Sequence, residues 1–393
     1  MKLIYLDYAA TTPMDPAVLA AMTPYFSEQF GNPSSVHAFG QDAQRAVDDT
    51  RKQIADVLGC GAQEVVFTAS ATEANNCALE GVVRASQKNR TDVLPHMIVS
   101  SIEHESVLEV AGSLAVRGEA EVSYAPVSRE GVVDVLALER MLRPETLLVS
   151  VGLANSETGV IQPIAPIAHA VSNFRKNSKL GAGYPLLHTD AAQGIYYLKP
   201  RCAELGVDLL TMSGHKIYGP KGIGALYVKR GTPLAPVIAG SGQEYGKRSG
   251  TENVPGIVGM GVAVAMAYRE PESARDSVAR LRDRFVESVF REIPDVALNG
   301  SREHRVPHNA NILFHGISSA DCIILLDREG VAVSAGTACQ AKAGRPSHVL
   351  AAMGLSERDV KSSVRFSMGK QTTAEDIDRT VSVLVKLVQK LRS

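Results

Sequence analysis

Short apolar runs alternate with helical stretches along the sequence up to about residue 228. The runs are rich in β-branched residues, which is typical of buried strands. They are EVVFT (64–68), HMIVSS (96–101), LLVSVGLA (147–154), PLLHTDAA (185–192), LLTMS (209–213) and GALYV (224–228). Between them, helical patterns lie over 71–85, 105–116 and 164–174. This rhythm predicts an α/β fold in which helices cover both faces of a mainly parallel sheet.

The pattern changes after Glu252. A long helical region from about 255 to 292 is followed by shorter units that include ILFHG (312–316), VAVSAG (331–336) and VRFSM (364–368). A chain of 393 residues with 45% apolar content is too long for one simple core. We therefore expect a large domain over residues 16–260 and a smaller α/β domain formed by residues 1–15 and 261–393.

Charge narrows the possible partners. Lys and Arg together number 41 against 42 Asp and Glu, and no run of like charges stands out. This balance argues against direct binding to nucleic acid or to an anionic membrane, and favours a small molecule or a protein partner. The longest weakly polar stretch, 254–268, is shorter than the roughly 20 residues of a membrane span. With no basic-then-apolar leader at the N-terminus, we expect a cytoplasmic protein.

The cysteines point to one reactive thiol. There are five, widely scattered and without a CxxC pair, which predicts neither a disulfide framework nor a metal site. Cys339 lies among small residues in SAGTACQAKAGRPSHVL, and the nearby Lys342 and Arg345 favour its thiolate. The others are expected to be mostly small buried hydrophobes: Cys60, Cys77, Cys202 and Cys322.

Several polar side chains follow the predicted strands, and the carboxyl ends of strands are where ligands bind in open α/β sheets. Asp190 ends the strand PLLH and needs a cation or strong donor, such as a protonated pyridine nitrogen, unless it is a cap or turn aspartate. Lys216 follows LLTM and suits an amine that attacks an aldehyde, with Ser213 and His215 donating to a phosphate. The alternatives are a surface lysine in a Gly-Pro loop, or Lys221 as the amine.

Four further sites have a functional and a structural interpretation. Ala71 and Thr72 begin a helix. The free N–H groups there either form an anion-binding site or are satisfied by an ordinary N-cap side chain. His104 could stack on an aromatic cofactor, or it could be a packed residue or a helix cap. Asn155, in LANSETG, could bind a cofactor or organise a tight turn. Arg365 lies inside an apolar strand and therefore needs a carboxylate, either the substrate's or a structural one.

Together and in this order, these residues resemble the cysteine desulfurases, class V members of the fold-type I pyridoxal-phosphate enzymes. The similarity covers nearly the whole chain. Its motifs are LDYAATTP, GNPSS, SIEH, NSETG, HTDAAQ, SGHKIYGPKGIGALYV, RSGTEN, GTAC and RFSMG. The resemblance implies a large domain with a mainly parallel seven-stranded sheet, a smaller C-terminal α/β domain, pyridoxal phosphate as cofactor, and a homodimer.

The resemblance also implies roles for individual residues. Lys216 would hold the cofactor as a Schiff base, Asp190 would pair with its pyridine nitrogen, and His104 would stack on its ring. Further contacts are implied at the phenolic oxygen from Gln193 and Asn155, and at the phosphate from Ala71, Thr72, Ser213, His215 and, from the other subunit, Thr251.

For the reaction, the resemblance implies L-cysteine as substrate, bound by Arg365, Asn155 and Asn32. Lys216 would move the α-proton and His104 would shuttle protons. The Cys339 thiolate would attack the substrate sulfur, leaving a persulfide on the enzyme and releasing L-alanine. A sulfur-acceptor protein or small thiol would then take the sulfur.

The spacing around Cys339, seven residues before Pro346, is similar to the longer-looped, iron-sulfur-associated members of the family. The sequence departs from these members where AGTAC is followed by Gln340, so the sulfur acceptor could differ from theirs. Iron-sulfur assembly, tRNA thiolation and DNA sulfur modification stay open. Three alternatives also remain: a selenocysteine lyase, which SSIEHESV and GTEN resemble; an aminotransferase, which needs no loop cysteine; and an inactive scaffold, which needs neither Lys216 nor Cys339.

Overall fold

A computed structural model describes residues 3–87, 94–181, 183–336 and 346–393. Its centre is a seven-stranded sheet of order β2-β8-β7-β6-β5-β3-β4, in which only β8 runs against the other strands. The strands are β2 (Val65–Thr68), β3 (His96–Ser100), β4 (Glu121–Ala125), β5 (Thr146–Ser150), β6 (Leu186–Asp190), β7 (Leu209–Ser213) and β8 (Gly224–Val228). The predicted α/β fold with a mainly parallel sheet is confirmed.

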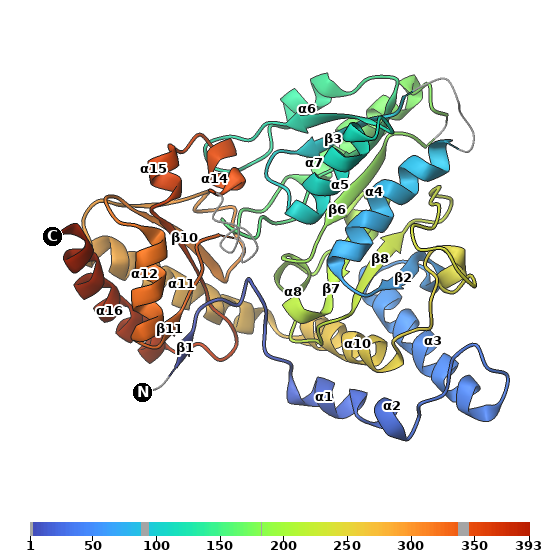
Figure 1. Ribbon diagram of the computed structural model, residues 1–393, viewed down its shortest axis with the longest axis horizontal. Coiled ribbons are helices and arrows are strands. Elements are labelled where there is room, and N and C mark those ends of the chain that lie inside the picture. Colours follow the sequence, from blue (N-terminus) through green and yellow to red (C-terminus); the bar gives the residue numbers. More distant parts are fainter. Residues whose placement is uncertain (1–2, 88–93, 182, 337–345) are drawn as a thin grey trace.

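Helices cover both faces of this sheet (Figure 1). Its central strands are therefore buried on both sides. In β7, for example, Leu209 and Leu210 belong to different hydrophobic clusters on opposite faces. The Leu209 cluster includes α4 (Ala71–Gln87) and α5 (Glu105–Val116). The Leu210 cluster includes α3 (Ala38–Leu58), α6 (Val135–Met141), α7 (Ile164–Phe174) and α10 (Val254–Arg269).

The edge strand β4 was not among the predicted strands. Its burial pattern explains why, because only Ala125 is fully buried and the other four residues are at least partly exposed. A strand with so little apolar content lacks the pattern on which the sequence prediction depended.

A separate hydrophobic cluster lies beside the large sheet. It is built on a three-stranded antiparallel sheet of order β12-β10-β9 and includes Ile4 and Leu6 from the start of the chain. Its elements are β9 (Val296–Leu298), β10 (Asn309–Phe314), β12 (Ser363–Ser367), α11 (Glu272–Glu292), α12 (Ser319–Arg328) and α16 (Ala374–Arg392). In addition, β1 (Ile4–Tyr5) pairs with β11 (Val331–Ala332). The exact boundaries between the two predicted domains stay a prediction.

The predicted helical region 255–292 is two helices. The first, α10, ends at Arg269, and α11 begins at Glu272 with Pro271 as its N-cap. Proline has no N–H to donate to the preceding turn, which explains the break. The break also separates two environments, because α10 packs on α3 whereas α11 packs on α16.

Short helices complete the described chain, and none of its helices is long and apolar enough to cross a bilayer. They are α1 (Pro16–Met22), α2 (Pro24–Ser27), α8 (Ile195–Leu198), α9 (Cys202–Leu205), α14 (His348–Ala352) and α15 (Glu357–Val360).

Candidate active site

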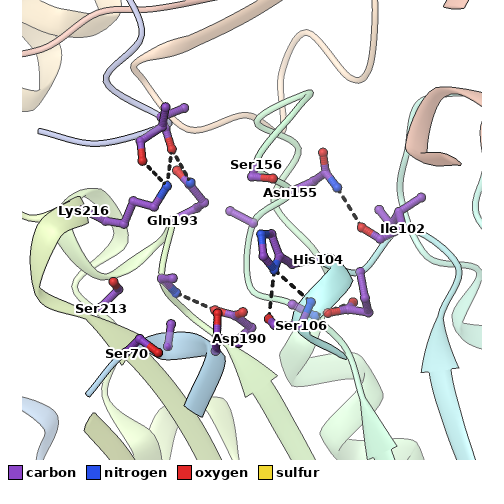
Figure 2. A pocket seen from close by; sticks show the side chains of 18 of the residues that line it. Ser70, Ile102, His104, Ser106, Asn155, Ser156, Asp190, Gln193, Ser213 and Lys216 are labelled. Carbon is purple, nitrogen blue, oxygen red and sulfur yellow. Dashed lines mark hydrogen bonds between the residues drawn. The ribbon is translucent and has the colours of Figure 1, made fainter. Parts of the chain in front are cut away.

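A pocket of about 290 Å³ lies at the carboxyl ends of β6 and β7 and the start of α4. Figure 2 shows its polar side chains converging from these elements. The structure brings most of the predicted site residues together here. The predicted residues that line it are Ala71, Thr72, His104, Asn155, Asp190, Gln193, Ser213, His215, Lys216 and Arg365.

Lys216 ends a short 3₁₀ turn, Gly214–Lys216, directly after β7. Its Nζ donates to the backbone oxygens of Ala9 at 2.5 Å and Ala10 at 2.7 Å. Gln193 Nε2 donates to the same Ala9 oxygen at 2.9 Å. The segment that follows β1 therefore forms one wall of the pocket. The competing amine, Lys221, is exposed and is not part of the pocket lining.

Asp190 is the last residue of β6 and faces the pocket (Figure 2). Its Oδ2 accepts from Asn75 Nδ2 at 2.8 Å, and its Oδ1 accepts from the backbone N of Ala192 at 2.9 Å. Both carboxylate oxygens thus accept from donors of the protein. The sequence predicted that Asp190, at the end of a buried strand, needs strong donors, and the protein supplies part of this need. The side of the carboxylate that faces the pocket is available to a cation.

The start of α4 forms one corner of the pocket. Ser70 Oγ accepts from Glu73 N at 3.1 Å, and Ala71 and Thr72 follow at the first helical positions. The adjacent Ser213 Oγ is buried without a hydrogen-bond partner among the described residues. An unpartnered buried hydroxyl beside a helix N-terminus suits a ligand oxygen, and the helix end favours an anion.

Close backbone packing shapes this corner. A Cβ at Gly224 of β8 would lie 2.6 Å from the carbonyl carbon of Ser70 and 2.9 Å from Ala71 N, so only glycine allows this approach. His215 completes the corner, with its Nδ1 3.1 Å from Thr11 Oγ1. Burial lowers the pKa of His215 to about 4, so its imidazole is neutral near pH 7. These groups fit a phosphate.

His104 has the predicted capping role at the start of α5, and it also lines the pocket. Its Nδ1 lies 2.8 Å from Ser106 Oγ and accepts from Ser106 N at 3.1 Å. Burial lowers the pKa of this imidazole below its ordinary value. His104 is therefore a neutral ring at neutral pH, and a flat ring at this wall can stack on an aromatic ligand.

Asn155 forms the tight turn that was the alternative to ligand binding. Its Oδ1 accepts from the backbone N of Glu157 and of Thr158, each at 2.9 Å, and its Nδ2 donates to Ile102 O at 2.9 Å. The second hydrogen on Nδ2 has no acceptor among the described residues and can be donated to a ligand. The turn and the ligand contact are therefore compatible.

Arg365 in β12 has the structural carboxylate that its burial requires. Its Nη2 lies 2.7 Å from Asp7 Oδ1, and its Nη1 donates to Ser156 O at 2.9 Å. Its Nε is buried and has no hydrogen-bond partner among the described residues. Arg365 lines the pocket, so a substrate carboxylate would share this guanidinium with Asp7.

Three predicted residues are not in this pocket. Asn32 is exposed and its Oδ1 accepts from Ser34 N at 2.9 Å. Thr251 is exposed and lines a separate cavity beside Arg248. Cys339 lies outside the described residues. The described positions on either side, Gly336 and Ser347, are both next to the Glu157 carboxylate.

Several polar residues of this site were not predicted as functional. Glu103 and Gln162 line the pocket, and Asn75 and Ser106 connect Asp190 with His104. Burial raises the pKa of Glu103 to about 8. Glu103 could have been suspected because it precedes His104 in SIEH, directly after a strand. Asn75 had no such signal, because it lies inside a helix.

Comparison with known proteins agrees with this site. The profile of the class-V aminotransferase family matches residues 4–380. The chain is 43% identical to the cysteine desulfurase IscS of Dictyoglomus turgidum over 392 residues, which cover 99% of this chain and 95% of that protein. The chain therefore belongs to the class-V aminotransferase family, and within it to the group whose members are named cysteine desulfurases.

Solved structures give the same result. A NifS-like protein superposes with a TM-score of 0.90 at 34% identity, covering 99% of this chain and all of that one. SspA in complex with cysteine superposes with a TM-score of 0.80 at 35% identity, covering 94% of this chain and all of that one. The similarity thus extends over both hydrophobic cores.

Proposed function

We propose that this protein is a pyridoxal-phosphate-dependent cysteine desulfurase that converts L-cysteine to L-alanine and keeps the sulfur as a persulfide on Cys339. The observation that carries the proposal is the pocket that unites Lys216, Asp190 and His104 with an anion corner, in a chain from the cysteine desulfurase group. A structural relative with cysteine bound, SspA, supports the substrate class.

The residues in the pocket fit pyridoxal phosphate. Its phosphate would accept from the α4 N-terminus and from Ser213 Oγ, which has no partner among the described residues. Lys216 supplies the amine for its aldehyde, and Asp190 supplies the carboxylate for its pyridine nitrogen. Once bound, the cofactor provides an electron sink for the electron pair at the substrate's α-carbon.

The protein's own groups then move protons and hold the substrate. Arg365 would bind the substrate carboxylate, with Asn155 and Asn32 as further substrate contacts. The Lys216 amine is placed to take the α-proton, and His104 to exchange a proton with the substrate thiol. Burial lowers the pKa of His104, so near pH 7 its ring is neutral and carries a single proton.

Sulfur transfer requires a thiolate, and Cys339 is the predicted nucleophile. Its sulfur forms a bond to the substrate sulfur while the bond between the substrate's β-carbon and sulfur breaks. The electron pair of the broken bond stays on the carbon side, and protonation there completes the methyl group of alanine. Cys339 follows Gly336 by three residues, and three residues span at most about 11 Å. Gly336 itself lies beside Glu157, next to the pocket-lining Ser156.

A second copy of the chain is the expected partner. The helices α1, α2 and α3 follow one another along one end of the molecule (Figure 1). They carry exposed apolar side chains, including Leu19, Phe26 and Phe39. Such a face is typical of a protein interface. In the homodimer Thr251 would reach the cofactor phosphate of the other subunit. A sulfur-acceptor protein is the further proposed partner, its identity stays open, and a cytoplasmic location stays a prediction.

The proposal is tested by offering the purified holoenzyme L-cysteine and L-selenocysteine in separate assays with a reductant. We expect alanine and sulfide in equal amounts from L-cysteine. Alanine from L-selenocysteine alone would replace the proposal with a selenocysteine lyase. Transfer of the amino group to an oxo acid, without sulfide, would replace it with an aminotransferase, and no product from either amino acid would favour the inactive scaffold.

A further inference from the structure

A polar side chain inside α4 is connected to two sides of the candidate active site. Asn75 is the fifth residue of the helix, and its side chain is fully buried among apolar neighbours such as Ala74 and Ala78. Asparagine is a poor residue for a helix interior, and burying its amide is costly without hydrogen bonds. The hydrogen bonds of the Asn75 side chain explain why an asparagine is accommodated at this position.

Asn75 donates both of its amide hydrogens within the site. Its Nδ2 lies 2.8 Å from Asp190 Oδ2 and 2.8 Å from Ser106 Oγ. An ionised carboxylate can only accept, so the amide nitrogen and not the amide oxygen must face Asp190. The amide oxygen is left buried without a partner among the described residues. A buried amide oxygen without a hydrogen bond costs free energy, which indicates that the two donated hydrogen bonds determine how Asn75 is oriented.

The hydroxyl of Ser106 passes this orientation to His104. Because Ser106 Oγ accepts from Asn75, its own hydrogen is available for His104 Nδ1, 2.8 Å away. His104 Nδ1 also accepts from the backbone N of Ser106 at 3.1 Å. With two donors directed at Nδ1, the neutral ring must carry its proton on Nε2. Figure 2 shows the His104 ring extending from Ser106 into the pocket.

We propose that Asn75 and Ser106 are positioning residues: Asn75 holds the Asp190 carboxylate as an acceptor, and through Ser106 it fixes His104 as the tautomer with its proton on Nε2. The inference rests on the proposed function for the roles of Asp190 and His104. One buried amide thereby couples the group that faces the cofactor nitrogen with the group that faces the substrate. Neither positioning residue needs to touch the reacting atoms.

The first test measures the imidazole of His104 directly. Long-range nitrogen–proton NMR of histidine-labelled holoenzyme, assigned with His104→Gln, reports which ring nitrogen carries the proton and the pH at which the ring titrates. Among the described residues, the charged or titratable groups around His104 include Asp190, Lys216, Glu105 and His348, together with the preceding Glu103 of the pocket lining. All of them are present in every variant compared, so the comparison isolates the hydroxyl of Ser106.

In wild type we expect a proton on Nε2 and a bare Nδ1. Ser106→Ala removes a donor that stabilises the neutral ring, so His104 should titrate at a pH higher by roughly half a unit to one unit. Ser106→Thr keeps the hydroxyl and should restore the wild-type midpoint. An unchanged titration in Ser106→Ala would overturn the proposed role of Ser106.

The second test measures cofactor affinity by visible absorption as pyridoxal phosphate is added back to resolved enzyme. Asn75→Ala removes a charge-assisted donor from Asp190, and the affinity should fall by roughly tenfold or more. The matched control is Asn76→Ala, because Asn76 is next in the same helix and its amide donates to Thr72 O, with no other acceptor in the described part of the chain. Equal affinities in the two variants would overturn the role of Asn75.

These readouts keep the inference separate from the proposed function. NMR titration and cofactor affinity require bound pyridoxal phosphate but no turnover of L-cysteine, so they remain decisive if the substrate proves to be different. If Asn75→Ala does not fold, Ser106→Ala still tests the relay, because it removes a single oxygen atom from a residue in the first turn of α5 that lines the pocket.

Discussion

The Lys216 amine contacts backbone atoms that are distant from it in the sequence. It is held by two carbonyl oxygens of the segment after β1, more than 200 residues earlier in the chain. Carbonyl oxygens are neutral acceptors, and these two contacts hold the amine at the wall of the pocket. The amine is therefore positioned where an aldehyde in the pocket could reach it.

The first prediction concerns this amine. Lys216→Ala should abolish the visible absorption of the lysine-linked cofactor and lower turnover of L-cysteine by roughly 10²–10⁴-fold or more, because the variant lacks the amine that links the cofactor and takes the α-proton. Absorption spectra and an alanine assay check this. Lys221→Ala is the control and should match wild type, since Lys221 is exposed and outside the pocket lining. A wild-type spectrum in Lys216→Ala would refute the cofactor assignment.

At this scale the sequence was a good guide to which residues are special and a poorer guide to their partners. Asp190, Lys216 and Arg365 were predictable because a charged group at or within an apolar strand must have a strong partner. That Arg365 pairs with Asp7 could not be predicted, because the pairing depends on how two distant segments meet. Asn75 was missed for the same reason.

A second prediction concerns a buried histidine in the large sheet. His188 in β6 lies between Ser150 Oγ at 2.9 Å and Thr211 Oγ1 at 3.1 Å. Burial lowers its pKa from 6.5 to about 4. Between these values the unfolded chain binds a proton that the folded protein does not, so stability is lost as the pH falls from about 6.5 to about 4.

For His188 this loss is about 2 kcal/mol between pH 7 and pH 5. Urea unfolding midpoints of wild type and His188→Gln over this range provide the test. The glutamine does not titrate, so the stability of wild type relative to the variant should decrease on acidification. A difference that stays constant with pH would show that His188 protonates equally in the folded and unfolded chain.

Among the elements, the start of α4 depends on close contact with β8. Gly224→Ala should force backbone atoms of Ser70 and Ala71 to move, because the new Cβ would lie 2.6–2.9 Å from them. We expect a loss of about 1–3 kcal/mol in stability and weaker binding of pyridoxal phosphate, since the anion corner is displaced. Thermal unfolding and cofactor titration measure the two effects.

The control for this prediction is Gly112→Ala in α5. A Cβ there meets nothing within 4 Å, and alanine is the better helix former, so stability should rise by up to about 1 kcal/mol. Cofactor affinity should not change. If Gly224→Ala bound the cofactor as tightly as Gly112→Ala, the anion corner would not depend on this contact.

Element prediction from the sequence succeeded for the buried strands of the large sheet, including the edge strand β2, and failed for the exposed edge strand β4. The five central strands β3 and β5 to β8 carry continuous apolar runs, whereas β4 is mostly half-exposed. The helical region 255–292 was predicted correctly as helical. Its division at Pro271 follows from the proline, which could have been used to place the break.

At the scale of the whole molecule, the exposed apolar face on α1, α2 and α3 predicts association. Phe26 and Phe30 are 62% and 66% exposed, and Phe30 lies 5.7 Å from Phe39 between ring centroids. We expect a dimer by sedimentation equilibrium. The double variant Phe26→Glu with Phe30→Glu should be monomeric and should bind pyridoxal phosphate more weakly, because each site would lose Thr251 of its partner.

The matched control is Phe290→Glu, which changes an exposed phenylalanine on α11, far along the chain from this face. It should remain dimeric. A wild-type protein that sediments as a monomer would contradict the homodimer, and a monomeric double variant with unchanged cofactor affinity would contradict the contribution of Thr251.

The central claim is that sulfur leaves L-cysteine through Cys339, and one assay tests it most directly. Alanine and sulfide release from L-cysteine, with a reductant present, should be measured for wild-type holoenzyme, Cys339→Ser and the control Cys60→Ser, since Cys60 is outside the pocket lining. We predict equal alanine and sulfide from wild type and Cys60→Ser, and neither product from Cys339→Ser despite normal cofactor absorption. Undiminished sulfide release by Cys339→Ser would contradict the account.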